Sequence, residues 1–336
     1  VTEEIEPGVY RVVSDGVREL SGLPADDERR YMGGVLDTNI AAGLDGSIWL
    51  FGLDGFYRLG ADAKHQWFED SWRDARPGQA DIEVGPGGTV WLQPTDRGDI
   101  WSFDGESWAT RRESDKNEVL SGLAVQQDGT VLTTWSTNPP GGKNKPQPRT
   151  TVARLGADGW EDLPGSVEGA GVVFHDVIVT DGGGEEVWLM PGFGPLRRHD
   201  GTGWVVQPTP VAGGEVRAAV GPDGTLWVRL VRCDSTTGCE GQAMTNRSSI
   251  LARFDGEVWE VFRAKDGIPM MGDHYQGFKG FFEAAPDRSI WFNPNGDLTK
   301  SECDGIANFD GQSVHHYLRG HCITAMDIAP DGTVWL

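Results

Sequence analysis

Histidine is the side chain best suited to acid–base chemistry near neutral pH, and the chain contains seven histidines. Three of them, His175, His274 and His321, fall beside carboxylates or in links between repeated motifs. Asp176 follows the first, and Asp273 precedes the second. These histidines could bind a metal ion or supply acid/base catalysis beside the carboxylates. No G-x-S-x-G, HExxH or P-loop motif is present, so none of these catalytic motifs supports an enzyme.

A repeated motif predicts the elements that position these residues. It consists of an Asp-Gly pair, or a variant of it, followed by a short apolar run that usually contains Trp. Asp-Gly between alternating apolar residues predicts a β-hairpin, and a type I′ turn with positive φ at both central residues is the expected geometry. The seven copies are LDGSIWL at 44–50, PGGTVWL at 86–92, QDGTVLT at 127–133, GGGEEVWLM at 182–190, PDGTLWV at 222–228, PDRSIWF at 286–292 and PDGTVWL at 330–336.

A second Asp-Gly motif alternates with the first, as in FDGESW at 103–108 and FDGEVW at 254–259. Each unit therefore contains four short strands joined by two tight turns and one longer loop, which is typical of a propeller blade. The predicted fold class is all-β: a seven-bladed β-propeller with four-stranded antiparallel blades, in a single domain over 1–336. Blades 1 to 6 are predicted at 35–68, 79–111, 119–164, 170–208, 215–264 and 280–318.

The last unit, at 322–336, has only its two inner strands. The segment GVYRVVSDGVREL at 8–20 has the form of a second hairpin without a first one before it. We therefore expect the N-terminal segment to supply the two outer strands of blade 7, which would remove an exposed sheet edge. The recurring Trp side chains are expected to fill the spaces between blades, and the Asp-Gly pairs to serve turn geometry.

Two runs of the sequence carry a family resemblance: SGLPADDE followed by GLDGSIWLFGLDGFYRL, and KDGIPMMGD followed by AAPDRSIWF and IANFDG. They resemble the two-component regulator propeller repeat, in which a DGLP-like link precedes a DGTLW hairpin and an FDG-W hairpin. This resemblance implies a sensor region outside the cytoplasm, although the chain shows no kinase, receiver or DNA-binding segment. Related DG-W hairpins occur in a propeller lyase of the virginiamycin type, which opens cyclic antibiotics, so a lyase or hydrolase is an alternative.

The predicted unit gives the propeller two different faces. Both Asp-Gly turns of each blade lie on one side, here called the turn face, and all other connections lie on the opposite side, the loop-rich face. The long inserts at 136–150, 232–248 and 293–303 fall on the loop-rich face. Because functional residues concentrate on variable loops over a rigid scaffold, we expect the binding site there, at the mouth of the central channel.

Inner-strand positions and the links before them predict the residues of this site. Their mixture of Arg, Asp, His and Tyr suits a small polar or carbohydrate-like ligand, held by aromatic stacking and directed hydrogen bonds. In blade 4 the register is ambiguous, so either His175 or Asp176 occupies the inner position. The candidates are Arg30, Tyr31, Asp37, Asn39, Arg76, Asp81, His175, Asp176, Arg217, Asp273, His274, Tyr275 and His321.

Four cysteines lie in loop segments, an even count that suggests two disulfides and an oxidising compartment. Three pairings are possible, and the favoured pairs are Cys233–Cys239 and Cys303–Cys322. We therefore expect a secreted, extracellular or periplasmic location, in a bacterial protein.

The net charge of -22 disfavours nucleic acid as a partner, because a polyanion is bound mainly by phosphate neutralisation. No run of apolar residues is long enough for a transmembrane helix, so no membrane contact by this segment is expected. We expect a monomer without a cofactor or bound metal. The first hypothesis is a binding propeller that acts as a sensor or recognition module; the alternatives are a lyase or hydrolase and a scaffold for protein partners.

Overall fold

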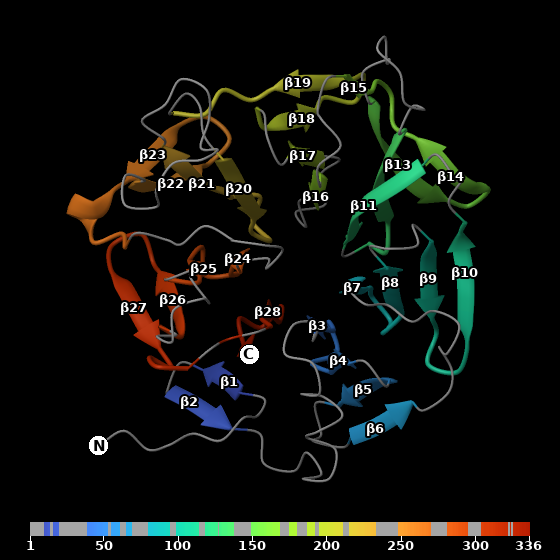
Figure 1. Ribbon diagram of the computed structural model, residues 1–336, viewed down its shortest axis with the longest axis horizontal. Coiled ribbons are helices and arrows are strands. Elements are labelled where there is room, and N and C mark those ends of the chain that lie inside the picture. Colours follow the sequence, from blue (N-terminus) through green and yellow to red (C-terminus); the bar gives the residue numbers. More distant parts are fainter. Residues whose placement is uncertain are drawn as a thin grey trace, which may run out of the picture.

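The architecture comes from a computed structural model, which describes residues 10–13, 16–19, 39–52, 55–60, 65–68, 80–94, 99–113, 118–126, 128–137, 149–168, 175–179, 187–191, 195–210, 215–232, 248–269, 281–294, 304–321, 323 and 325–336. Within these residues, antiparallel strands dominate, and the sheets are arranged around a central axis (Figure 1). The described part of the chain contains no helix long and apolar enough to cross a membrane.

Six blades are each built from one contiguous stretch of chain, with the strands in sequence order. Blade 1 contains β3 (Asn39–Ala42), β4 (Ile48–Gly52), β5 (Gly55–Leu59) and β6 (His65–Phe68). Blade 2 contains β7 (Ala80–Val84), β8 (Val90–Pro94), β9 (Ile100–Phe103) and β10 (Trp108–Arg112). Blade 3 contains β11 (Glu118–Val125), β12 (Val131–Thr137), β13 (Arg149–Gly156) and β14 (Gly159–Asp162), and the short β15 (Val167–Glu168) also pairs with β13.

The other three contiguous blades follow the same plan. Blade 4 contains β16 (His175–Val179), β17 (Val187–Pro191), β18 (Arg197–His199) and β19 (Trp204–Val206). Blade 5 contains β20 (Glu215–Val220), β21 (Leu226–Arg232), β22 (Ser248–Phe254) and β23 (Trp259–Phe262), followed by a single 3-10 turn, η2 (Ala264–Asp266). Blade 6 contains β24 (Phe282–Ala284), β25 (Ile290–Phe292), β26 (Ile306–Phe309) and β27 (Val314–Tyr317).

The remaining sheet joins the two ends of the chain, in the order β2-β1-β29-β28. β1 (Tyr10–Val13) and β2 (Gly16–Glu19) form its outer half, and β28 (Asp327–Ile328) and β29 (Val334–Trp335) form its inner half. Arg11 pairs with Trp335 and Val12 with Val334. This is the two-plus-two closure that the sequence predicts: six contiguous blades and one closing sheet made from both ends.

The turns differ from the predicted type I′ geometry. In blade 1 the Gly46 N–H donates to the Gly43 carbonyl at 3.0 Å, and the Gly43 N–H donates to the Ser47 carbonyl at 2.7 Å. Only Gly46, at φ 75°, has a positive φ in this turn; Asp45 does not. The hairpin therefore uses a type I turn followed by one left-handed residue, a longer loop than the predicted two-residue turn. The Asp45 carboxylate accepts hydrogen bonds from the Ser47 N–H and hydroxyl, which confirms its structural role.

The recurring Trp side chains fill the spaces between blades, as predicted. Trp49, Trp188 and Trp227 are among the largest fully buried side chains. Trp49 of blade 1 packs with Val90, Leu92 and Phe103 of blade 2, at ring centroids 6.1 Å apart for the Trp49–Phe103 pair. Because such apolar layers recur at each seam, burial between neighbours holds the ring of blades together.

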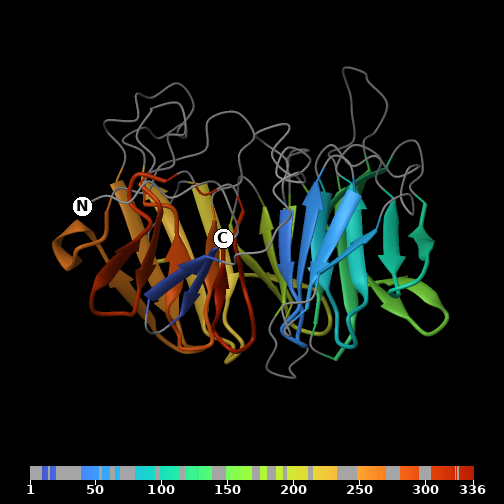
Figure 2. The same ribbon diagram turned by 90° about the horizontal axis from the view of Figure 1, so that it is seen from below.

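The innermost strands form a closed ring around the axis, in the order β28, β3, β7, β11, β16, β20, β24 and back to β28. Six of these strands, all except β16, lead into a described tight turn of their own blade's first hairpin, so these six run toward the turn face. Figure 2 shows the ring from the side, with the tight hairpin ends of the coloured strands gathered at the lower edge. This strand ring therefore lies nearest the central axis (Figure 1).

Candidate functional site

The pairing register within each blade shows which inner-strand residues lie at the same depth in the channel. Asp81 lies opposite Gln93, Arg217 opposite Arg229, and Asp176 opposite Met190, two residues beyond each motif Trp. This register resolves the ambiguity in blade 4, because Asp176 and not His175 holds the position equivalent to Asp81. The level nearer the loop-rich face, here called the mouth level, contains Asn39, Asp81, Gly122, Asp176 and Arg217.

Two side chains of the mouth level carry opposite charges. Asp81 is on β7 and Arg217 is on β20, and both side chains are partly buried. In the strand ring, β11 and β16 separate β7 from β20 on one side, so the two residues are on different sides of the central axis. The mouth level therefore carries an acidic and a basic side chain on different sides of the axis. For Asn39, His175 and Asp176, only the backbone belongs to the described structure.

A second level of the channel lies two residues further along each inner strand. Here the residues lie opposite the motif Trp or its Leu replacement. Blades 2 and 6 and the closing sheet place carboxyl groups there, from Glu83, Glu283 and Asp327. The other blades place apolar residues there: Ala41, Ala124, Ile178 and Ala219.

Sequence reasoning missed this carboxyl level, because it considered only the positions six residues before each turn Asp. The same alignment read four residues before the turn Asp, or its counterpart, would have found Glu83, Glu283 and Asp327.

Asp327 connects three parts of the ring. Its Oδ2 accepts a hydrogen bond from the Ala42 N–H of blade 1 at 2.5 Å, and its Oδ1 accepts one from the Ile328 N–H at 2.8 Å. The Glu283 carboxyl of blade 6 is also hydrogen-bonded to it. One carboxylate of the closing sheet therefore bonds to both neighbouring blades.

Burial shapes the protonation of this pair. It raises the pKa of Asp327 to about 6, while the N–H groups of Ala42 and Ile328 and the Glu283 carboxyl act in the opposite direction. Burial also raises the pKa of Glu283 well above its usual value, and the negative charges of Asp327 and Glu83 raise it further. Because two adjacent carboxylates repel each other, their contact favours a proton on Glu283, whose carboxyl then donates to Asp327.

Three of the described histidines take structural positions. The His321 Nδ1 lies 3.2 Å from the Leu318 carbonyl oxygen and 3.3 Å from that of Arg319, so its ring is held against its own turn. His199 bonds to the Pro164 carbonyl oxygen and to the Gly201 N–H within the turn face of blade 4. His315 pairs with Asp310 in an outer hairpin of blade 6. None of these described rings lies beside another histidine in a metal-binding arrangement.

Several predicted residues lie outside the described residues. They include Arg30, Tyr31, Asp37, Arg76, Asp273, His274 and Tyr275, and all four cysteines, Cys233, Cys239, Cys303 and Cys322. Their contribution to the mouth, the two disulfides and a lyase based on His175, His274 and His321 therefore stay predictions. Within the described part of the chain, no three His, Cys, Asp or Glu side chains are grouped as a metal site.

Comparison with known proteins gives the fold class and no closer identity. No protein-family model matches the chain, and no curated protein matches its sequence. Membership of the two-component regulator propeller family therefore stays an expectation.

Solved structures do match the chain. An oligogalacturonate lyase in complex with manganese matches at a TM-score of 0.60 and 11% identity, over 89% of this chain and 88% of that chain. Virginiamycin B lyase from Staphylococcus aureus matches at 0.56 and 11% identity, over 89% of this chain and 93% of that one. YCF48 bound to D1 peptide matches at 0.51 and 12% identity, over 90% and 93% of the two chains. The chain is a β-propeller, and identities this low carry the fold alone.

Proposed function

We propose that this propeller is a recognition module that binds a small polar ligand, carbohydrate-like compounds included, or a protein partner at the channel mouth on the loop-rich face. The observation that carries the proposal is the mouth level. Asp81 and Arg217 lie at the same level of the strand ring on different sides of its axis, so this level combines an acidic and a basic group. Pockets of this kind typically combine a rigid frame with a few directed polar groups.

The contrast between the two faces supports this location. On the turn face, backbone hydrogen bonds and Asp side chains close the turns tightly, as at Asp104, whose Oδ1 accepts bonds from the Glu106 and Ser107 N–H groups. The longer connections leave the strands at the opposite ends, between β12 and β13, between β21 and β22, and between β25 and β26. A rigid ring with variable connections at one end is a common support for recognition.

The proposal includes a sensor role outside the cytoplasm, in a secreted or exposed domain. The resemblance of the repeats to sensor propellers and the even number of cysteines support this part. Peptide mapping of the unreduced protein tests it. Cys233–Cys239 and Cys303–Cys322 disulfides are the expected result, and four alkylatable thiols in freshly purified protein would contradict it.

Binding measurements test the mouth directly. Calorimetric titration of the full chain with glucose, N-acetylglucosamine and glycine supplies neutral and zwitterionic polar probes. We expect at least one probe to bind and both Asp81→Asn and Arg217→Gln to weaken that binding by about tenfold, the cost of one hydrogen bond to a charged group. Glu106→Gln, an exposed change on the turn face, is the matched control. Binding that is unchanged in both mouth variants would exclude the mouth as the small-ligand site, and no binding of any probe would favour a protein partner.

A further inference from the structure

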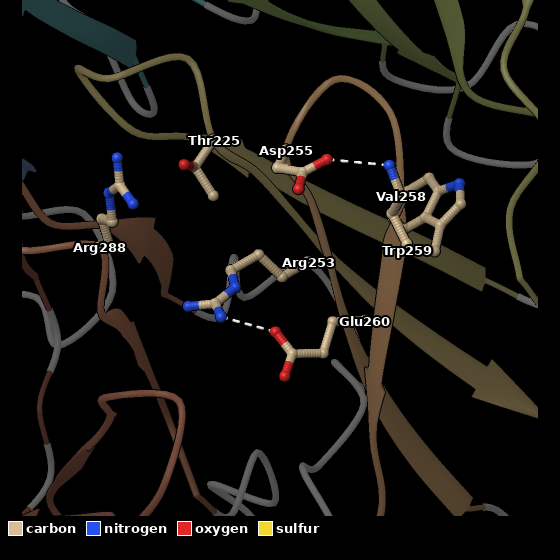
Figure 3. A pocket seen from close by; sticks show the side chains of 7 residues that line it. All are labelled: Thr225, Arg253, Asp255, Val258, Trp259, Glu260 and Arg288. Atoms are coloured by element: carbon tan, nitrogen blue, oxygen red, sulfur yellow. Dashed lines mark hydrogen bonds and ion pairs between the residues drawn. The ribbon is translucent and has the colours of Figure 1, made fainter.

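A pocket of 390 Å³ opens on the turn face, at the seam between blades 5 and 6 (Figure 3). It lies away from the mouth, because its walls come from tight turns and from the outer strands of blade 5. Arginine side chains enter it from both blades. Its lining includes Thr225, Arg253, Asp255, Trp259, Glu260 and Arg288.

Arg288 breaks a rule that the other first-hairpin turns obey. In those described turns, the left-handed position is occupied by glycine: Gly46, Gly88, Gly129, Gly224 and Gly332. Blade 6 places Arg288 there, at φ 71°. A side chain in this conformation is strained relative to glycine, because the Cβ approaches the following carbonyl oxygen. The strain calls for a compensating role of the side chain.

The stability gained by Arg288 does not clearly offset that strain. Its Nε pairs with the Asp223 Oδ2 of blade 5 at 2.7 Å, and the Arg288 side chain is 68% exposed. An exposed ion pair of this kind contributes little to stability. In blade 1 the equivalent Asp45 pairs within its own blade, with Arg58 at 2.7 Å. The turn carboxylate of blade 5, Asp223, thus pairs with the neighbouring blade. Arg253 of blade 5 does not pair with it and lines the pocket.

Arg253 supplies the second guanidinium. Its Nη2 pairs with the Glu260 carboxylate at 2.6 Å, and its guanidinium lies over the Trp227 ring, 5.4 Å from the centroid. Its Nη1 also lies against Gly311 of blade 6. Figure 3 shows the Arg253 guanidinium directed toward the side of the pocket where Arg288 lies. The pocket therefore has one guanidinium group from each blade in its lining, each also paired with a carboxylate.

We propose that this pocket binds a small oxyanion, a carboxylate or phosphate group. Arginine is suited to this task because its planar fork of donors matches the geometry of these anions. The bound anion takes the place of the Glu260 carboxylate at Arg253; Glu260 is 54% exposed and can rotate into solvent. The Asp255 carboxylate stays where it is, because it accepts the Glu257 and Val258 N–H groups at 3.0 and 2.8 Å.

This geometry gives opposite expectations for two variants. Arg288→Gly restores the residue that the other turns use, so the fold tolerates it, and it removes one anion-binding group. Glu260→Gln removes the carboxylate that competes for Arg253. Anion binding should therefore weaken in Arg288→Gly by about tenfold and strengthen in Glu260→Gln by roughly threefold or more. Arg319→Gly, which removes an exposed arginine elsewhere in the described structure, controls for net charge.

Calorimetric titration of the full chain with benzoate, phenyl phosphate, inorganic phosphate and the neutral benzyl alcohol is the test. We expect the two aromatic anions to bind, inorganic phosphate to compete with them, and benzyl alcohol to bind about tenfold more weakly or not at all. The inference fails if no anion binds, if benzyl alcohol binds as well as benzoate, or if Arg288→Gly binds like the unaltered chain. Asp81→Asn should leave this binding unchanged, so the outcome is independent of the proposed mouth site.

Discussion

The contiguous blades and the closing sheet both contain four hydrogen-bonded antiparallel strands, but the chain joins these strands differently. In blade 5, one covalent chain joins all four strands, and β21 and β22 pair over seven positions, from Leu226↔Phe254 to Arg232↔Ser248. In the closing sheet, β1 and β29 are joined only by their pairing at Arg11↔Trp335 and Val12↔Val334. The closing sheet must therefore gain its stability from contacts with its neighbours. Two apolar clusters supply them, one shared with blade 6 and one with blade 1.

Deleting residues 1–20 should have the largest effect on the stability of the closing sheet. It removes β1 and β2, leaves β29 as an open edge, and should lower the free energy of unfolding by several kcal/mol and promote association between chains. Thermal unfolding and size-exclusion chromatography measure both effects. Deleting only residues 1–9, before β1, is the matched control. An unaltered melting temperature in the longer deletion would refute the closure.

Replacing a motif Trp by Ala should cost about 3–5 kcal/mol of stability in either region, because a large buried side chain is lost. Trp227→Ala in blade 5 and Trp335→Ala in the closing sheet test this, since both side chains are buried. Only Trp335→Ala should also speed hydrogen exchange in β1 and β2, because it loosens the sheet to which they are attached. Equal exchange in both variants would show that the closing sheet is as cooperative as a contiguous blade.

The Glu283–Asp327 pair makes a contribution to stability that decreases as the pH rises. Asp327 and Glu283 both have raised pKa values in the folded state, Asp327 at about 6 against 3.8. Their contribution to stability is therefore fully present below the unfolded pKa values and is lost as the pH rises through about 6 and above. Glu283→Gln keeps a donor for Asp327 and removes one ionisation. At about pH 8 it should raise the free energy of unfolding by roughly 1–2 kcal/mol, with little change near pH 4.

The stability contributed by the turn carboxylates has the opposite pH dependence. Hydrogen bonds from Ser47 and the Arg58 side chain lower the pKa of Asp45, against the effect of its partial burial. Hydrogen bonds from Thr225 and the positive charge of Arg288 do the same for Asp223. Their contribution is present above the unfolded pKa and is lost as the pH falls through the folded pKa.

A Glu283→Gln stability curve parallel to that of the unaltered chain from about pH 4 to 8 would show that the carboxyl pair does not titrate in folding.

Arg288→Gly should give the smallest effect. Relief of the left-handed strain and loss of the exposed ion pair with Asp223 nearly cancel, so stability should stay within about 1 kcal/mol of the unaltered chain. Chemical denaturation measures this difference. A loss above about 2 kcal/mol would mean that Arg288 is chiefly a structural link between blades 5 and 6, and would weaken the case for an anion site.

Local sequence patterns predicted the hairpins well and their details less well. The Asp-Gly motifs mark the turns correctly, but Asp45 does not adopt the positive φ of a type I′ turn; Gly46 alone takes it. The difference arises because one extra residue in the loop allows a type I turn, and counting loop residues requires the strand pairing. Likewise, the inner-strand position of blade 4 could be assigned to Asp176 only from its pairing with Met190.

The sequence by itself determined the repeated unit, the burial of the motif Trp residues and the joining of the two chain ends, because these follow from short-range patterns and from one missing half-unit. Only the tertiary structure decided which side chains share the channel and the seams. The Ala42–Asp327 hydrogen bond joins residues 285 positions apart. The Glu283–Asp327 pair and the Arg288–Asp223 pair likewise connect different blades. Such contacts depend on how neighbouring sheets are placed around the axis, and no local pattern along the chain records that placement.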